Sequence, residues 1–135
     1  MMFRYTDSID YYSIPLLPID EFSSSVVSAC AAGRRMIAFF GLRPADEVEL
    51  ICILCDDAAG MLEAFRTVPG RSYRALTPEC PQAHLFEREI SELWGIHPQE
   101  HPWLKPVRYC PSVQGDRRNR PGPAQTNYFR VEGSE

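Results

Sequence analysis

The alternation of apolar and polar positions predicts ordered elements along most of the chain. After an aromatic, proline-punctuated start, apolar residues recur at helical spacing from about Asp20, a good N-cap, to Gly33, where the helix can end. Two strongly apolar runs follow at residues 35–42 and 48–55, with turn-forming residues between them. Their length and composition predict an antiparallel β-hairpin after the first helix.

The segment at residues 56–70 fits two structures. Asp57 could cap a short helix. Equally, residues 62–68 could form a third strand that ends at Pro69 and Gly70. Periodicity cannot decide between a helix and a strand over so short a run, so both alternatives stay open at this point.

A second helix is predicted from Pro81 to Trp94. Residues 72–76 before it look extended, proline is tolerated in the first turn of a helix, and Gly95 lets the chain leave it. The order of helix, hairpin, strand and helix predicts a two-layer α+β fold with a mixed or antiparallel sheet.

Composition predicts one domain followed by a tail. Residues 1–110 form the α+β domain, whereas residues 111–135 are rich in Pro, Gly and Arg and are typical of an extended linker or tail. The net charge of −4 argues against nucleic-acid binding. No apolar run approaches the roughly 18 residues of a membrane span, so no direct membrane insertion is expected. The five irregularly spaced cysteines indicate reduced thiols in a cytoplasmic protein.

Residues 86–102, FEREISELWGIHPQEHP, hold the densest set of chemically active side chains. On the predicted helix, the apolar residues that share the sheet-facing side are Ala83, Phe86, Ile90 and Leu93. Glu87 faces away from that stripe, and Arg88 and Glu92 stand four apart, where they can pair. The pattern reveals no second group and no cleft for acid–base catalysis. It therefore predicts a charged surface that faces solvent or an interface.

Two histidines after this helix raise the alternative of a small metal-dependent enzyme. His97 and His101 are four residues apart, and Cys110 is a further candidate ligand. Pro98 and Pro102 make the segment extended or turn-like, because a residue before proline avoids the helical region. The candidate ligands also follow no known zinc spacing, which disfavours this alternative.

A longer signature lies in the same region. It comprises Glu87, Arg88, Glu89, Glu92, Leu93, Trp94, Gly95, Ile96, His101, Pro102 and Lys105. With the lead-in at residues 72–84, it closely resembles the thirty-kilodalton subunit family of respiratory complex I. It also resembles the equivalent domain of group 4 membrane-bound nickel–iron hydrogenases. The resemblance spans roughly residues 15–110 and favours a strand at residues 62–68.

The resemblance implies a structural subunit without an active site or cofactor of its own. Such a subunit lies peripheral to the inner membrane, in the cytoplasmic arm of its complex. It docks on iron–sulfur subunits and on the large subunit that holds a quinone site or a nickel–iron centre. The implied interface residues are Glu87, Arg88, Glu89, Glu92, Trp94, His97, His101, Pro102 and Lys105. Trp94 would be the anchor, because buried aromatic residues contribute much of the binding energy at interfaces.

The end of the chain carries a separate resemblance. Residues 128–133 resemble the stretch that leads into the catalytic large subunit of hydrogenase-type proteins. This implies that the chain is the N-terminal domain of a longer polypeptide, or a split version of one. A stand-alone protein-binding module is a third alternative, beside the structural subunit and the metal-dependent enzyme.

Overall fold

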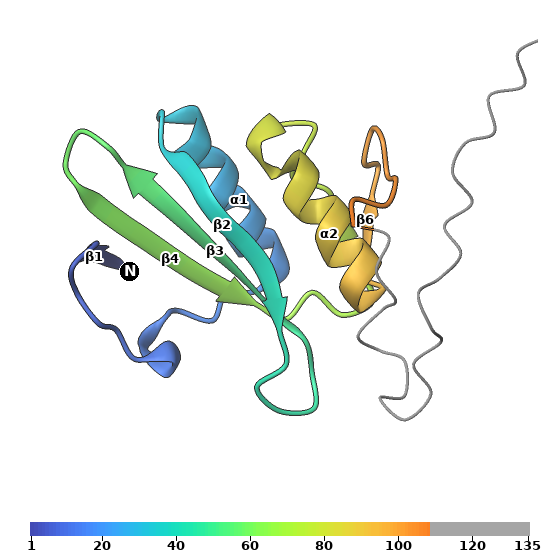
Figure 1. The fold of residues 1–135 in the computed structure, drawn as a ribbon, viewed down its shortest axis with the longest axis horizontal. Helices are drawn as coiled ribbons and strands as arrows, with labels where there is room; N and C mark the ends of the chain where they lie inside the picture. The colour runs from blue at the N-terminus through green and yellow to red at the C-terminus, as the bar shows by residue number, and fades with distance from the viewer. Residues whose placement is uncertain (109–135) are drawn as a thin grey trace, which may run out of the picture.

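The computed structural model describes residues 1–108, in which two α-helices pack on one side of a four-stranded sheet (Figure 1). The elements in chain order are β1 (Met2–Arg4), the 3-10 helix η1 (Tyr11–Ser13), α1 (Ile19–Ala31), β2 (Arg35–Leu42), β3 (Glu49–Asp56), β4 (Met61–Thr67), β5 (Ser72–Arg74), the 3-10 helix η2 (Pro81–Ala83), α2 (His84–Trp94) and β6 (His97–Gln99). The predicted α+β class is confirmed. The predicted tail at residues 111–135 lies outside the described residues.

The four strands of the main sheet are antiparallel and follow the order β1-β4-β3-β2. The predicted hairpin is confirmed, with Phe39 opposite Cys52 across β2 and β3. A bulge between Met36 and Ala38 shifts the register near the start of β2. Strand β2 is an edge of the sheet, and α2 packs against it.

The ambiguous segment after β3 is a strand, so the alternative of a short helix capped by Asp57 is wrong. A tight turn explains the result, because Gly60 adopts a φ of 65° and the Asp56 carboxylate accepts a hydrogen bond from the Ala59 amide. The turn brings β4 back along β3, where Phe65 lies opposite Cys52. Pairing with β3 therefore decides what periodicity left open.

Helix α1 begins slightly earlier than the sequence predicts. Its N-cap is Pro18, and Asp20 lies inside the first turn, so the prediction of Asp20 as N-cap is wrong. An acid in the first turn still favours the helix, because it interacts with the positive end of the helix dipole. At the other end Gly33 has a φ of 90° and its amide bonds to the Cys30 carbonyl, as expected for a glycine that ends a helix.

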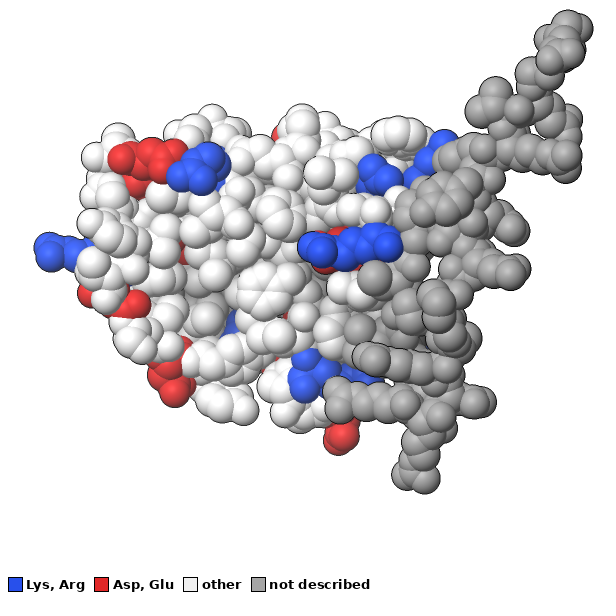
Figure 2. Space-filling view, in the orientation of Figure 1, with Lys and Arg blue, Asp and Glu red and all other residues white. Residues whose placement is uncertain are grey.

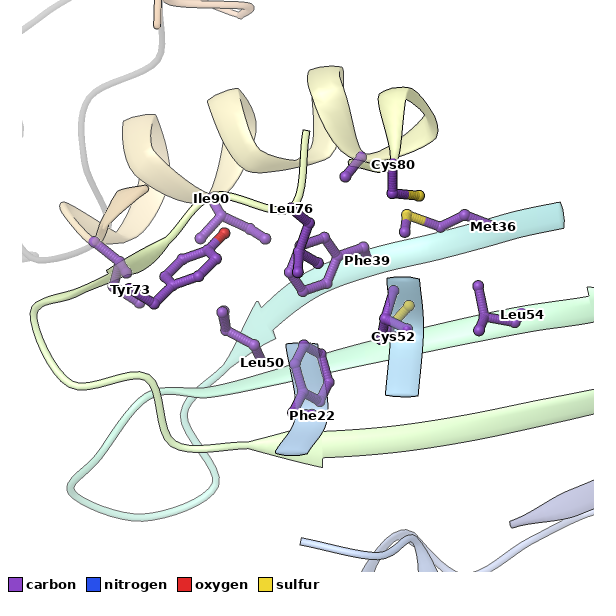
Figure 3. Close-up of a cluster of buried hydrophobic side chains, with 13 residues drawn as sticks. Phe22, Met36, Phe39, Leu50, Cys52, Leu54, Tyr73, Leu76, Cys80 and Ile90 are labelled. Carbon is purple, nitrogen blue, oxygen red and sulfur yellow. The ribbon is translucent and has the colours of Figure 1, made fainter. Parts of the chain in front are cut away.

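The hydrophobic core lies between the sheet and the two helices (Figure 3). Helix α1 contributes Phe22 and Val26, both fully buried, and the Phe22 ring lies 6.0 Å from the Phe39 ring of β2. The core residues labelled in Figure 3 are Phe22, Met36, Phe39, Leu50, Cys52, Leu54, Tyr73, Leu76, Cys80 and Ile90. Ile90 from α2 joins both helices to one core.

Strands β5 and β6 pair with each other in a second, two-stranded parallel sheet. In the chain, β5 precedes α2 and β6 follows it. Ser72 lies opposite His97, and the Ala75 amide donates to the Gln99 carbonyl. The predicted second helix is confirmed, although its first turn, Pro81–Ala83, is a 3-10 helix. Gly95 takes the left-handed conformation predicted for the exit, with a φ of 66°. The β5–β6 pair thus anchors both ends of α2.

Within residues 1–108, none of the helices combines the length and the apolar character that a membrane crossing requires.

Candidate functional site

Glu87 is fully buried, so the prediction that it faces outward from α2 is wrong. Its carboxylate accepts hydrogen bonds from the Leu76 amide at 2.7 Å, the Thr77 amide at 3.0 Å and the Thr77 hydroxyl at 2.5 Å. Burial raises the pKa of Tyr73 well above its ordinary value, and the nearby negative charge of Glu87 adds to this rise. Glu87 therefore holds the segment before α2 in place.

His101 lies beside Glu87 with its side chain also fully buried. The Trp103 amide donates to His101 Nδ1 at 3.1 Å, and His101 Nε2 lies 3.3 Å from the His84 carbonyl oxygen. Since Nδ1 accepts a hydrogen bond, this pattern fits a neutral ring that carries its proton on Nε2. Burial lowers the pKa of His101, partly offset by the Glu87 carboxylate 4.0 Å away.

Arg88 joins α2 to the loop after β6. Its guanidinium donates to the backbone carbonyl of Lys105 at 2.6 Å and to that of Pro106 at 2.9 Å. It also lies 5.1 Å from the centre of the Trp103 ring, and the Lys105 ammonium lies 5.0 Å from the same centre. Two cations therefore lie near one aromatic ring, an arrangement that attracts each charge to the ring.

The two remaining glutamates of α2 hold the end of the same loop. The Glu92 carboxylate accepts hydrogen bonds from the amides of Val107 and Arg108, at 2.7 and 2.9 Å. Glu89 forms an ion pair with Arg108. Arg88, Glu89 and Glu92 therefore all contact the loop and hold it against α2.

Trp94, the predicted interface anchor, packs inside this domain. A Cβ added at Gly41 of β2 would lie 2.4 Å from Trp94 Nε1, so the indole sits directly on the glycine backbone. Trp94 belongs to the partly buried residues around the core, and the Arg43 guanidinium lies 5.6 Å from its ring. The exposed tryptophan is Trp103, which is 53% accessible.

The structure separates the two histidines of the metal alternative. His97 is exposed on β6, whereas both ring nitrogens of His101 have backbone partners. The ring stacked on His101, at 5.3 Å, belongs to His84. In residues 1–108 no three His, Cys, Asp or Glu side chains come together in a way that could hold a metal ion, and Cys110 lies outside that range.

The exposed part of this region forms one continuous patch, which we call the α2–loop surface. It consists of Leu85, Arg88, Glu89, Pro102, Trp103 and Lys105. Leu85 is 57% exposed beside His84, whose ring stacks on Trp103 at 6.1 Å. Sequence reasoning missed Leu85 and Trp103. An apolar residue opposite the core stripe and a tryptophan directly after the His-Pro step were the available signals.

Residues 36–117, more than half of the chain, match the family described as respiratory-chain NADH dehydrogenase, 30 kDa subunit. The match covers β2 except its first residue and every later element through β6, including the α2–loop surface, whereas α1 precedes it. A search among curated proteins gave no match.

The chain therefore belongs to the respiratory-chain NADH dehydrogenase 30 kDa subunit family. A subunit of this kind works in a complex with other subunits.

Proposed function

We propose that the chain is a non-catalytic docking subunit of a respiratory-chain oxidoreductase, and that the α2–loop surface is where it meets its neighbours. The observation that carries this proposal is Trp103, which is half exposed and has the cations of Arg88 and Lys105 close to its ring. Large aromatic and arginine side chains account for much of the binding energy at protein interfaces.

The surface is also rigid before binding. Trp103 is stacked on His84, its amide is bonded to buried His101, and the following carbonyls are held by Arg88. A surface that is already ordered loses little conformational entropy on association, so more of its contact energy appears as affinity. This preorganisation favours tight docking.

The proposed partners are the large subunit and the iron–sulfur subunits of the complex, on its cytoplasmic side. Under this proposal the iron–sulfur clusters and the quinone site or nickel–iron centre belong to those partners, and this chain holds no cofactor. Whether the parent complex is of the NADH dehydrogenase or the hydrogenase type depends on the large subunit. A gene product longer than residue 135 that continues into a large subunit would support the hydrogenase type.

The proposal is tested by co-purification of the complex from cells that express all its subunits. Trp103→Ala should leave the fold of the isolated chain intact and lower the recovery of the large subunit by about tenfold, as expected for an interface anchor. The matched control is Tyr5→Ala, because Tyr5 is 77% exposed beyond β1 at the opposite end of the domain. Unchanged recovery with Trp103→Ala would contradict the proposal.

A further inference from the structure

A cleft of about 770 Å³ lies next to the α2–loop surface but is distinct from it. It is bounded by the β2–β3 loop, the β4–β5 connection and the exit from α2. Its lining includes Arg43, Asp46, Glu47, Arg71 and the buried Ile96. Its volume falls within the range of clefts that hold a ligand.

The two arginines of the cleft differ from most of the other arginines in residues 1–108. Arg34, Arg35, Arg66, Arg74 and Arg108 each form an ion pair with an aspartate or glutamate. Arg88 is satisfied by backbone carbonyls. In the same part of the chain, neither Arg43 nor Arg71 has a carboxylate within ion-pair distance, although the chain as a whole carries a net charge of −4.

Arg43 is also held in position. Its guanidinium lies over the Trp94 ring, and Trp94 is packed against the Gly41 backbone of β2. A guanidinium stacked on an aromatic face keeps its edge free to donate hydrogen bonds to a carboxylate. Figure 2 shows that Lys and Arg side chains are more frequent toward the α2 end of the face in view, and Asp and Glu toward the opposite end. The free edge of the Arg43 guanidinium therefore favours an acidic group on a partner.

We infer that this cleft binds an acidic segment of a neighbouring subunit, with Arg43 and Arg71 each meeting a carboxylate of that segment. The inference rests on the proposed function, since it assumes a partner subunit. It adds a second contact to the complex, separate from Trp103, and states the chemistry of the partner segment. Asp46 and Glu47 line the same cleft and repel the acidic groups of a partner. They therefore restrict binding to segments whose carboxylates meet the two arginines.

The direct test uses a hexaglutamate peptide and the full-length chain carrying Trp103→Phe, so that the remaining fluorescence comes from Trp94 under Arg43. The peptide should change this fluorescence with a saturable dependence that weakens as salt is added. Arg71→Ala should weaken binding about threefold and the double variant Arg43→Ala/Arg71→Ala about tenfold, in line with exposed ion pairs. Asp46→Asn should tighten it.

The matched control is Arg4→Ala, which removes an arginine from β1 at the other end of the sheet. Equal weakening in Arg4→Ala and Arg71→Ala would reduce the effect to net charge and overturn the inference. Absence of saturable binding would do the same. Far-UV circular dichroism of each variant verifies that the fold is retained.

In the assembled complex, Arg71→Glu should lower recovery of the partner subunits while Arg4→Glu does not. If Arg71→Glu has no effect but Trp103→Ala does, the cleft inference is wrong and the proposed function stands. If neither substitution lowers recovery, the proposed function itself is wrong.

Discussion

The Glu87 carboxylate lies 4.0 Å from His101 Nε2, and both side chains are fully buried. Glu87 comes from the first turns of α2, whereas His101 follows β6. Between them they organise the two chain segments that flank the helix, because Glu87 binds residues 76–77 and His101 binds the Trp103 amide. Glu87 and His101, which the sequence suggested as contacts for a partner, thus bind segments of this chain and hold the α2–loop surface in place.

Loss of the Glu87 carboxylate should destabilise the domain strongly. In Glu87→Ala three donors, two amides and the Thr77 hydroxyl, lose their acceptor inside the protein. We expect the free energy of unfolding to fall by about 3 kcal/mol, measured by urea denaturation. Glu89→Ala is the control, because its partner Arg108 is largely exposed and a surface pair contributes under about 1 kcal/mol. Equal losses in both variants would contradict the buried role of Glu87.

The lowered pKa of His101 predicts a pH dependence of stability. The unfolded chain binds a proton near the ordinary histidine pKa of 6.5, whereas the folded chain binds it only at lower pH. The contribution of neutral His101 to the free energy of unfolding is therefore fully present above pH 6.5. It is lost as the pH falls from 6.5 towards the lowered pKa of the folded state. Urea denaturation at a series of pH values should show this loss in the wild type and not in His101→Gln. His97→Gln, altered at an exposed histidine, should keep the wild-type profile.

Gly41→Ala should displace the Trp94 ring from β2. The added Cβ would meet indole atoms at 2.4 and 2.6 Å, so the side chain must move. We expect the free energy of unfolding to fall by about 1–3 kcal/mol, as for other overpacked sites. In a Trp94→Phe background the clash is relieved, so Gly41→Ala should cost clearly less there. The same cost in both backgrounds would show that the close approach to the indole is not the cause.

Gln82 should protect the exposed edge of β2. Its side-chain carbonyl accepts from the Met36 amide at 2.7 Å, and its amide donates to the Arg34 carbonyl at 3.1 Å, in the manner of a neighbouring strand. Gln82→Ala should speed hydrogen exchange at the Met36 amide and cost about 1–2 kcal/mol of stability. Gln99→Ala, which removes an exposed bond to Ser72, should leave Met36 exchange unchanged. Unaltered Met36 exchange in Gln82→Ala would contradict the edge role.

Local signals in the sequence were enough to predict most elements. The apolar runs at residues 35–42 and 48–55 predicted the hairpin, and Gly33 and Gly95 marked the ends of both helices, because only glycine adopts a positive φ without strain. The signature around α2 pointed to the family that the comparison then showed. These features depend on neighbouring residues, which the sequence displays directly.

Only the tertiary structure decides which polar and aromatic side chains in and after α2 are buried and which stay exposed. Helical spacing placed Glu87 outside the core stripe, yet the chain before the helix folds over it and supplies three donors. Trp94 turns inward because Gly41, distant in sequence, leaves room for an indole. Trp103 stays exposed because Arg88 and His101 hold its loop on the helix. Contacts between segments far apart in the chain determine burial, and no periodicity within one segment encodes them.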